Sequence, residues 1–198
     1  MAKTKSFEHY AENYDIWFEK HKTIYDDEVR TAKKLIGSAS NGFEIGIGSG
    51  KFALPLGIKI GIEPSRRMRE IAQAKGLDVI DGVAEDLPFE NEKFDFAAMI
   101  TTICFVDDLF QALSEAYRVI MPGGFLLVGM VDKNSPMGKE YQMKKAKSKF
   151  YGEASFYSSE EVTSLAQKAG FVYDASLGVE STHNDFIFIK YIKPKTLS

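Results

Sequence analysis

The sequence has very little cysteine, no long apolar run and no excess of charge of either sign. Its single cysteine, Cys104, excludes internal disulfide bonds, and three scattered histidines leave no cluster at zinc-site spacing. Because 25 basic and 28 acidic residues are mixed along the chain, a dedicated nucleic-acid binder is disfavoured. No stretch approaches the roughly 20 apolar residues that span a bilayer, and residues 1–20 carry charges throughout. These absences predict a soluble, cytoplasmic protein without a metal ion, a membrane or a nucleic acid as its partner.

The residues that are present indicate one α/β domain. A chain of 198 residues, 44% of them hydrophobic, can bury one good core, and it contains no repeats or linkers. We therefore expect residues 1–198 to form a single domain. Residues 6–37 show apolar positions at helical spacing, which predicts two helices that form an N-terminal cap over residues 1–37. The aromatic side chains of this cap either pack on the domain or cover a ligand site.

The central feature is a glycine-rich loop at residues 43–50, Phe-Glu-Ile-Gly-Ile-Gly-Ser-Gly. A short strand runs directly into Gly46, Gly48 and Gly50, and helical propensity resumes after the last of them. Glycines at alternate positions let a ligand lie against the bare backbone, and the helix that follows favours a negatively charged group. A loop of this kind is also compatible with a simple connection in an α/β domain, so its neighbours must decide between the two interpretations.

An acid follows the next strand, at the position where a ligand of the glycine loop would lie. Residues 58–62 alternate as a strand that ends in Glu63, and Ser65 is a suitable N-cap for a helix over residues 66–75. Glu63 would lie at the carboxyl end of a parallel strand, where open α/β sheets bind ligands. It could accept hydrogen bonds from both hydroxyls of a ribose, or be a solvated loop carboxylate; in either case we expect it to be exposed.

The remaining pattern continues the alternation of strands and helices. Strands are predicted at residues 77–80, 94–100, 125–131, 171–173 and 186–189, and helices at 109–120 and 159–169. Residues 132–157 interrupt this pattern with five lysines between Lys139 and Lys149, followed by aromatic residues. This segment is predicted to be either a solvated helix or an inserted cap over a substrate, whose lysines would attract an acidic substrate or a phosphate.

Five segments together resemble the motifs of class I S-adenosylmethionine-dependent methyltransferases of the small-molecule type, the Methyltransferase domain 11-like family. The segments are Glu44-Ile-Gly-Ile-Gly-Ser-Gly50, Gly61-Ile-Glu-Pro-Ser65, Ala84-Glu-Asp-Leu-Pro-Phe89, Phe94-Asp-Phe96 and Leu113-Ser-Glu-Ala-Tyr-Arg-Val-Ile-Met-Pro-Gly-Gly124. Residues 14–17 also resemble the opening helix of that family. The resemblance implies a Rossmann-like, doubly wound, seven-stranded and mostly parallel sheet with an antiparallel last strand and an N-terminal helical lid.

The resemblance also implies S-adenosylmethionine as the cofactor. By resemblance, the cofactor-binding residues are Glu44, Gly46, Gly48, Gly50, Glu63, Pro64, Ala84, Glu85 and Thr101. The three glycines would lie along its methionine part, Glu63 at the ribose, Ala84 and Glu85 at the adenine, and Thr101 beside the sulfonium. Two departures from the family pattern are notable. Val83 stands where the family usually has an acid, so that Glu85 or Asp86 would have to replace it at the adenine, and Pro55 shortens the first helix to one or two turns.

Methyl transfer from a sulfonium depends mainly on the positioning of donor and acceptor, so no fixed catalytic residue is required. If a general base is used, His9, Tyr14 and Asp107 are the candidates. Residues 100–105 lack the Asn/Asp-Pro-Pro-Tyr pattern of enzymes that methylate nucleic-acid bases or glutamine side chains. The expected acceptor is therefore a small molecule, with nitrogen, oxygen, carbon and sulfur all open as the methylated atom.

Two other functions compete with methyl transfer. An NAD-dependent oxidoreductase would need a glycine at Lys51 and an acid about 20 residues beyond the glycines. A protein that binds S-adenosylmethionine or S-adenosylhomocysteine without catalysis would have the same motifs, and only a turnover assay separates it from an enzyme.

Overall fold

The structure, a computed structural model, describes residues 3–195 apart from the side chain of Glu12. Its strands are β1 (Gly42–Ile45), β2 (Ile60–Ile62), β3 (Asp78–Ile80), β4 (Phe94–Ile100), β5 (Ile120–Val131), β6 (Val172–Gly178) and β7 (Phe186–Ile192). They form one seven-stranded sheet in the order β3-β2-β1-β4-β5-β7-β6. The first five strands of this order are parallel, while β7 runs antiparallel to both β5 and β6. The predicted fold class is thereby confirmed.

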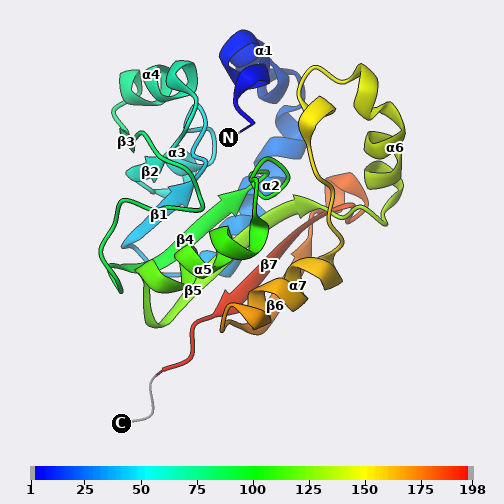
Figure 1. The fold of residues 1–198 in the computed structure, drawn as a ribbon. Helices are drawn as coiled ribbons and strands as arrows, with labels where there is room; N and C mark the ends of the chain where they lie inside the picture. The colour runs from blue at the N-terminus through cyan, green and yellow to red at the C-terminus, as the bar shows by residue number, and fades with distance from the viewer. Residues whose placement is uncertain (1–2, 196–198) are drawn as a thin grey trace.

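Helices cover both faces of the sheet (Figure 1). They are α1 (Lys5–Lys20), α2 (Lys22–Ile36), α3 (Ala53–Leu56), α4 (Arg66–Ala74), α5 (Leu109–Val119), α6 (Pro136–Lys144) and α7 (Ser159–Lys168), with the 3-10 turns η1 (Lys145–Lys147), η2 (Tyr151–Glu153) and η3 (Glu180–Thr182). Buried side chains of α5 and α7 pack on one face of the sheet, and those of α2, α3 and α4 pack on the other. Alternate residues of each strand supply the two core clusters, as the side-chain period of a strand requires.

Local signals in the sequence account for several of these helix boundaries. The Ser65 side chain accepts a hydrogen bond from the Met68 amide, and Ser158 forms a capping box with Glu161 at the start of α7. The helix α3 is a single turn that contains Pro55, as predicted.

Three strands are longer than the sequence pattern indicates, and one of them, β7, continues to Ile192 rather than ending at residue 189. β5 begins at Ile120 rather than at residue 125, because the sheet accommodates the Pro-Gly-Gly segment with an irregularity opposite Phe94 and Phe96. β6 extends to Gly178, although it lies at the sheet edge with mostly exposed or half-buried side chains. A strand that faces solvent in this way lacks the apolar alternation that would reveal it.

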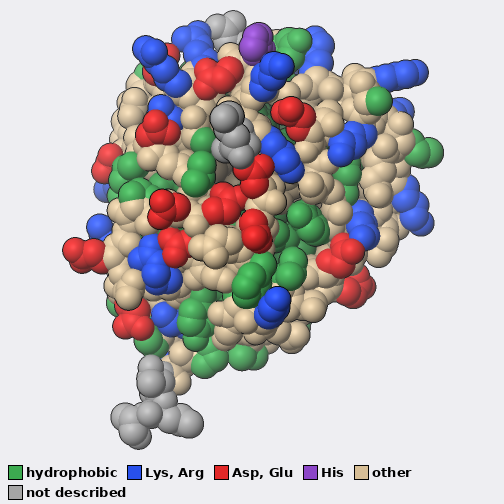
Figure 2. Space-filling model, in the orientation of Figure 1, with side chains coloured by type: hydrophobic (Ala, Val, Ile, Leu, Met, Phe, Trp, Pro, Cys, Tyr) green, Lys and Arg blue, Asp and Glu red, His purple; other side chains and the backbone are tan. Residues whose placement is uncertain are grey.

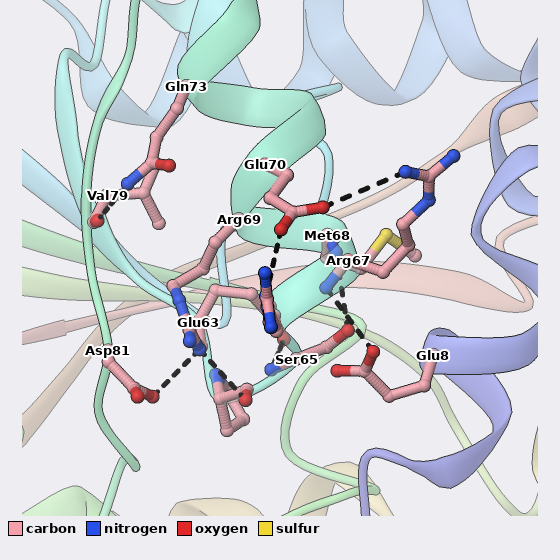
Figure 3. A network of polar contacts seen from close by, with 12 residues as sticks. Glu8, Glu63, Ser65, Arg67, Met68, Arg69, Glu70, Gln73, Val79 and Asp81 are labelled. Carbon is pink, nitrogen blue, oxygen red and sulfur yellow. Dashed lines mark hydrogen bonds and ion pairs between the residues drawn. The ribbon is translucent and has the colours of Figure 1, made fainter.

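The helix α1 lies over the edge of the sheet where β1, β2 and β4 end (Figure 1). Asp15 holds it there, because its carboxylate accepts hydrogen bonds from the Ser49 hydroxyl and, at 2.9 Å, from Lys75 Nζ. Glu8 makes a longer contact, accepting from the Arg67 backbone amide at 3.4 Å (Figure 3). No helix in the described part of the chain is both long and apolar enough to cross a membrane.

Candidate functional site

The glycine loop lies at the carboxyl end of β1, between β2 and β4, where the direction of the sheet order reverses. Gly46 and Gly48 have positive φ angles of 70° and 56°. A Cβ atom on Gly48 would have only Tyr14 nearby, at 3.9 Å, so the space above this residue is open. A Cβ atom on Gly50, in contrast, would lie 2.3 Å from Leu77 Cδ1. Gly48 therefore leaves room for a ligand, whereas Gly50 allows the loop to pack against Leu77, the residue before β3.

Glu63 closes the same site from the end of β2. One of its carboxylate oxygens accepts from the Gly48 amide at 2.9 Å and the other from the Ser65 amide at 2.8 Å. The expectation of an exposed loop carboxylate was wrong: only 7% of Glu63 is exposed, because α4 and the glycine loop enclose it. Burial raises the pKa of Glu63 to about 7, against the opposing effect of the two backbone hydrogen bonds.

Arg69 fixes the backbone that carries this acid. Its Nη1 donates to the carbonyl oxygens of Glu63 and Pro64, at 2.7 and 2.9 Å, and to the Asp81 carboxylate at 2.8 Å (Figure 3). The turn between β2 and α4 is thus tied to the loop after β3.

Glu44 lies behind the glycine loop and is 2% exposed. Burial raises its pKa well above the usual range, and the charge of Glu63 raises it further. Its Oε2 atom has no hydrogen-bond partner among the described residues. A buried acceptor without a partner is costly, and a donor on a bound ligand would satisfy it.

A cavity of about 210 Å³ joins these elements. Seven of the nine residues predicted to bind the cofactor line it: Gly46, Gly48, Glu63, Pro64, Ala84, Glu85 and Thr101. Glu44 and Gly50 are not among the lining residues. The open space over Gly48 and the remaining lone pairs of the Glu63 carboxylate fit a cofactor that brings a ribose diol and a flexible chain to this edge of the sheet.

Glu85 occupies the end of the cavity predicted for the adenine. Its Oε1 atom accepts from the backbone amides of Asp107 and Asp108, at 2.7 and 3.1 Å, and so fixes the loop that precedes α5. Val83 and Ala84 line the cavity beside it. The Glu85 side chain thus has a structural role, and Asp86 does not line the cavity.

The end of β4 carries a strained residue at the centre of the cavity. Thr101 has a φ angle of 55°, which is uncommon for a β-branched residue, and its hydroxyl donates to the Ile100 carbonyl at 2.7 Å. The Tyr14 hydroxyl forms a side-chain hydrogen bond with Thr101, while burial raises the Tyr14 pKa above its usual value. Tyr14 of α1 therefore reaches across the cavity to the strand end.

The three candidates for a general base are separated by the fold. Tyr14 lines the cavity, whereas His9 and Asp107 are exposed and do not line it. His9 Nδ1 lies 2.9 Å from the Lys5 carbonyl, one turn back in the same helix. In the described part of the chain, no three His, Cys, Asp or Glu side chains are grouped as metal ligands.

The sequence interpretation missed Glu28, which lines the cavity from α2 and is only 4% exposed. A signal was present, because Glu28 shares one helix face with the buried residues Ala32, Leu35 and Ile36, at helical spacing. An acid on the apolar face of a helix is unusual and indicates a specific environment.

Of the interpretations left open for residues 132–157, an attraction of acidic substrates by the lysines finds no support in the cavity. None of the lysines between residues 139 and 149 lines the cavity, and Lys144 forms an exposed ion pair with Glu140. The cap contributes apolar and aromatic side chains instead, among them Tyr141, Phe150 and Tyr151.

A family model described as "Methyltransferase domain" matches residues 43–128 of this chain. A crystal structure from Thermotoga maritima, described as a "SAM-dependent methyltransferase, possible histamine N-methyltransferase", superimposes with a TM-score of 0.88. It is 42% identical in sequence, and the alignment covers 96% of this chain and 99% of the other.

Two relatives extend the comparison. An uncharacterized protein of Methanocaldococcus jannaschii is 42% identical over 165 residues, which cover 83% of this chain and 80% of the relative. The mitochondrial 2-methoxy-6-polyprenyl-1,4-benzoquinol methylase of Xenopus laevis is 33% identical over 152 residues, covering 65% of this chain and 48% of that protein.

Proposed function

Because this chain belongs to the S-adenosylmethionine-dependent methyltransferases and its cofactor is S-adenosylmethionine, we propose that it methylates a small-molecule acceptor. The observation that carries this proposal is the single cavity, which runs from the glycine loop and Glu63 to the aromatic cap at Tyr141 and Tyr151. The predicted cofactor residues and the aromatic side chains of the cap thus line the same space, and we call the part lined by Tyr141 and Tyr151 its second compartment. Ligand pockets for small organic molecules have this character.

The proposal assigns residues 1–198 to one methyltransferase domain, in which residues 132–157 form the acceptor cap. The cofactor would be held by the seven predicted residues that line the cavity, whereas Glu44 lies behind the loop and does not line it. The Glu63 carboxylate, which would bind the ribose, is oriented by the two backbone amides from which it accepts hydrogen bonds. These amides hold both oxygens in place before a ligand arrives, so that little reorganisation is needed on binding.

When bound, S-adenosylmethionine supplies a methyl group on a sulfonium; a lone pair of the acceptor forms the new bond to carbon while the carbon–sulfur electrons stay on sulfur. The chain itself contributes position and exclusion of water. Tyr14 and Thr101, joined by their side-chain hydrogen bond, border the space between the two compartments. Phe7 packs edge to face with Phe105 and tilted against Phe150, and these three rings line the cavity and keep it apolar.

A small acceptor is also supported by what surrounds the cavity. The face of the molecule in Figure 2 shows basic and acidic side chains interspersed, without a stripe of one sign that would track a polymer. The names of the Thermotoga and Xenopus relatives both refer to small organic acceptors, an amine and a quinol.

Titration calorimetry followed by a turnover assay tests the proposal. The purified protein should bind S-adenosylmethionine and S-adenosylhomocysteine, should not bind NAD, and should release S-adenosylhomocysteine with at least one member of a panel of amines, thiols, hydroxyl compounds and carboxylates. Binding of NAD without a response to S-adenosylhomocysteine would refute the cofactor assignment. Cofactor binding without turnover on any acceptor class would favour a binding protein instead.

A further inference from the structure

The cavity contains three acidic side chains, and two of them are satisfied by the protein. Glu63 and Glu85 each accept two backbone amide hydrogen bonds. Glu28 is different, because its carboxylate forms no hydrogen bond or ion pair with any of residues 3–195. The residue is nevertheless buried, with only 4% of its surface exposed. The neighbouring acid Asp27, in contrast, has partners. Its carboxylate accepts a hydrogen bond from the Ser181 amide at 2.9 Å and forms an ion pair with Arg30 at 3.2 Å.

A buried carboxylate without a partner lowers the stability of the fold. Burial raises the pKa of Glu28 to about 8, and the adjacent charge of Asp27 acts in the same direction. A leucine at this position of α2 would pack in the same space without that cost. A buried acid that lowers stability and lines a cavity indicates a role in ligand binding.

The side chains around Glu28 are aromatic. Tyr141 and Tyr151 stack with ring centroids 4.9 Å apart, and Tyr151 also stacks on Phe105 at 5.9 Å. Tyr14, Tyr141 and Tyr151 line the same cavity as Glu28. After burial, the charge of Glu28 is among the effects that raise the pKa of these three phenols.

No positive charge of the protein competes for this acid within the cavity. Lys3 is the one basic residue among the described residues that line it, and its Nζ donates to the Val106 carbonyl and the Ser155 hydroxyl, both at 3.2 Å. A carboxylate surrounded by aromatic rings is an arrangement that binds organic cations, through charge pairing and cation–π contacts together.

We propose that the methyl acceptor carries an ammonium group, which the Glu28 carboxylate binds among the rings of Tyr14, Tyr141 and Tyr151. Where this nitrogen is itself methylated, it first gives a proton to the Glu28 carboxylate, and the lone pair so freed attacks the methyl group. The inference rests on the proposed function, because it assigns the second compartment of the cavity to the acceptor. It names a substrate class, small aliphatic or arylalkyl amines, and a specificity residue that the motifs of the cofactor site do not include.

The test compares matched ligands in the presence of saturating S-adenosylhomocysteine at pH 8, where simple amines are still protonated. The probes are 2-phenylethylamine, tyramine, cyclohexylmethylamine and butylamine, each paired with the alcohol in which a hydroxyl replaces the amino group. Calorimetry should show at least one amine binding at least tenfold more tightly than its alcohol. If every alcohol binds as well as its amine, the inference is overturned, and this comparison needs no variant.

Two variants locate the effect. Glu28→Gln keeps the size of the side chain and should reduce the preference for the amine to less than threefold. Asp26→Asn makes the same chemical change two residues earlier in α2, at an exposed residue paired with Lys22, and should leave the preference intact. A preference that survives Glu28→Gln would refute the role of this residue.

The two levels of the proposal fail differently. If the wild-type protein does not bind S-adenosylhomocysteine, the proposed function itself fails. If it binds S-adenosylhomocysteine without any preference for amines, only the assignment of Glu28 and of the substrate class fails.

Discussion

Replacing Glu63 by glutamine tests the cofactor site at its most constrained residue. Each oxygen of the carboxylate already accepts one backbone amide, from Gly48 or from Ser65, which leaves one lone pair per oxygen for a ribose hydroxyl. Glutamine keeps one such oxygen and puts an NH₂ group in place of the other. The NH₂ group cannot accept a hydrogen bond from a backbone amide, so that two hydrogen-bond donors would face each other.

The expected loss can be worked out from these contacts. The variant loses a charge-assisted hydrogen bond to the cofactor and weakens the other, and each is worth about 1.5–3 kcal/mol. We expect the affinity for S-adenosylhomocysteine to fall by about 2–4 kcal/mol, a factor of roughly 30 to 700. Alanine is a less informative replacement, because it leaves two buried amides without an acceptor and would lower folding stability by about 1–3 kcal/mol for each.

Calorimetry with S-adenosylhomocysteine and with its 2′,3′-dideoxy analogue measures this loss. The analogue should bind the wild-type protein weakly and lose little more in the variant, since its partner atoms are already absent. Glu70→Gln, an exposed change in α4 next to the site, is the matched control and should leave the affinity unchanged within about twofold. An unaltered affinity for S-adenosylhomocysteine in Glu63→Gln would refute the placement of the ribose.

Three further predictions concern the lid, the loop and the buried acid. The pKa of Glu28 rises from 4.5 to about 8 on folding, so stability should fall as pH rises between these values; Glu28→Gln should remove on the order of 4 kcal/mol of that fall, as measured by urea unfolding at pH 5 and 8.5. Gly48→Ala should cost only about 1–2 kcal/mol of stability, because the residue has a positive φ, but it should abolish cofactor binding in calorimetry. Gly46→Ala should in addition lower the melting temperature clearly, because its Cβ would lie 2.5 Å from the Thr102 side chain. Phe18→Ala should lower the free energy of unfolding by about 3 kcal/mol, whereas Tyr10→Ala, at a residue 36% exposed, should change it by less than about 0.5 kcal/mol; equal effects would show that α1 does not contribute to the core.

Much of the fold was readable because its signals are local. The Ser65 cap and the Ser158 capping box each act over three residues. The strands β1 and β4 are buried along almost their whole length, so that most of their residues are apolar. The order of the motifs along the chain then predicted the parallel sheet and the edge at which ligands bind. Only the first residues of the strand β6 were predicted, because its side chains are largely in contact with solvent.

The sequence by itself determined which residues form the glycine loop, because the conformation of a glycine turn or a helix cap depends on residues that are close in the sequence. The tertiary structure alone decided which charged side chains face the cavity. His9 and Glu28 are both polar residues on predicted helices, yet one is exposed and the other is enclosed. The enclosure of Glu28 depends on Tyr141, Tyr151 and Thr182, which lie more than 100 residues further along the chain and line the same cavity. The apolar helix face that Glu28 shares with Ala32 and Leu35 indicates burial, but the residues that enclose the acid, and with them its pKa, depend on such distant packing.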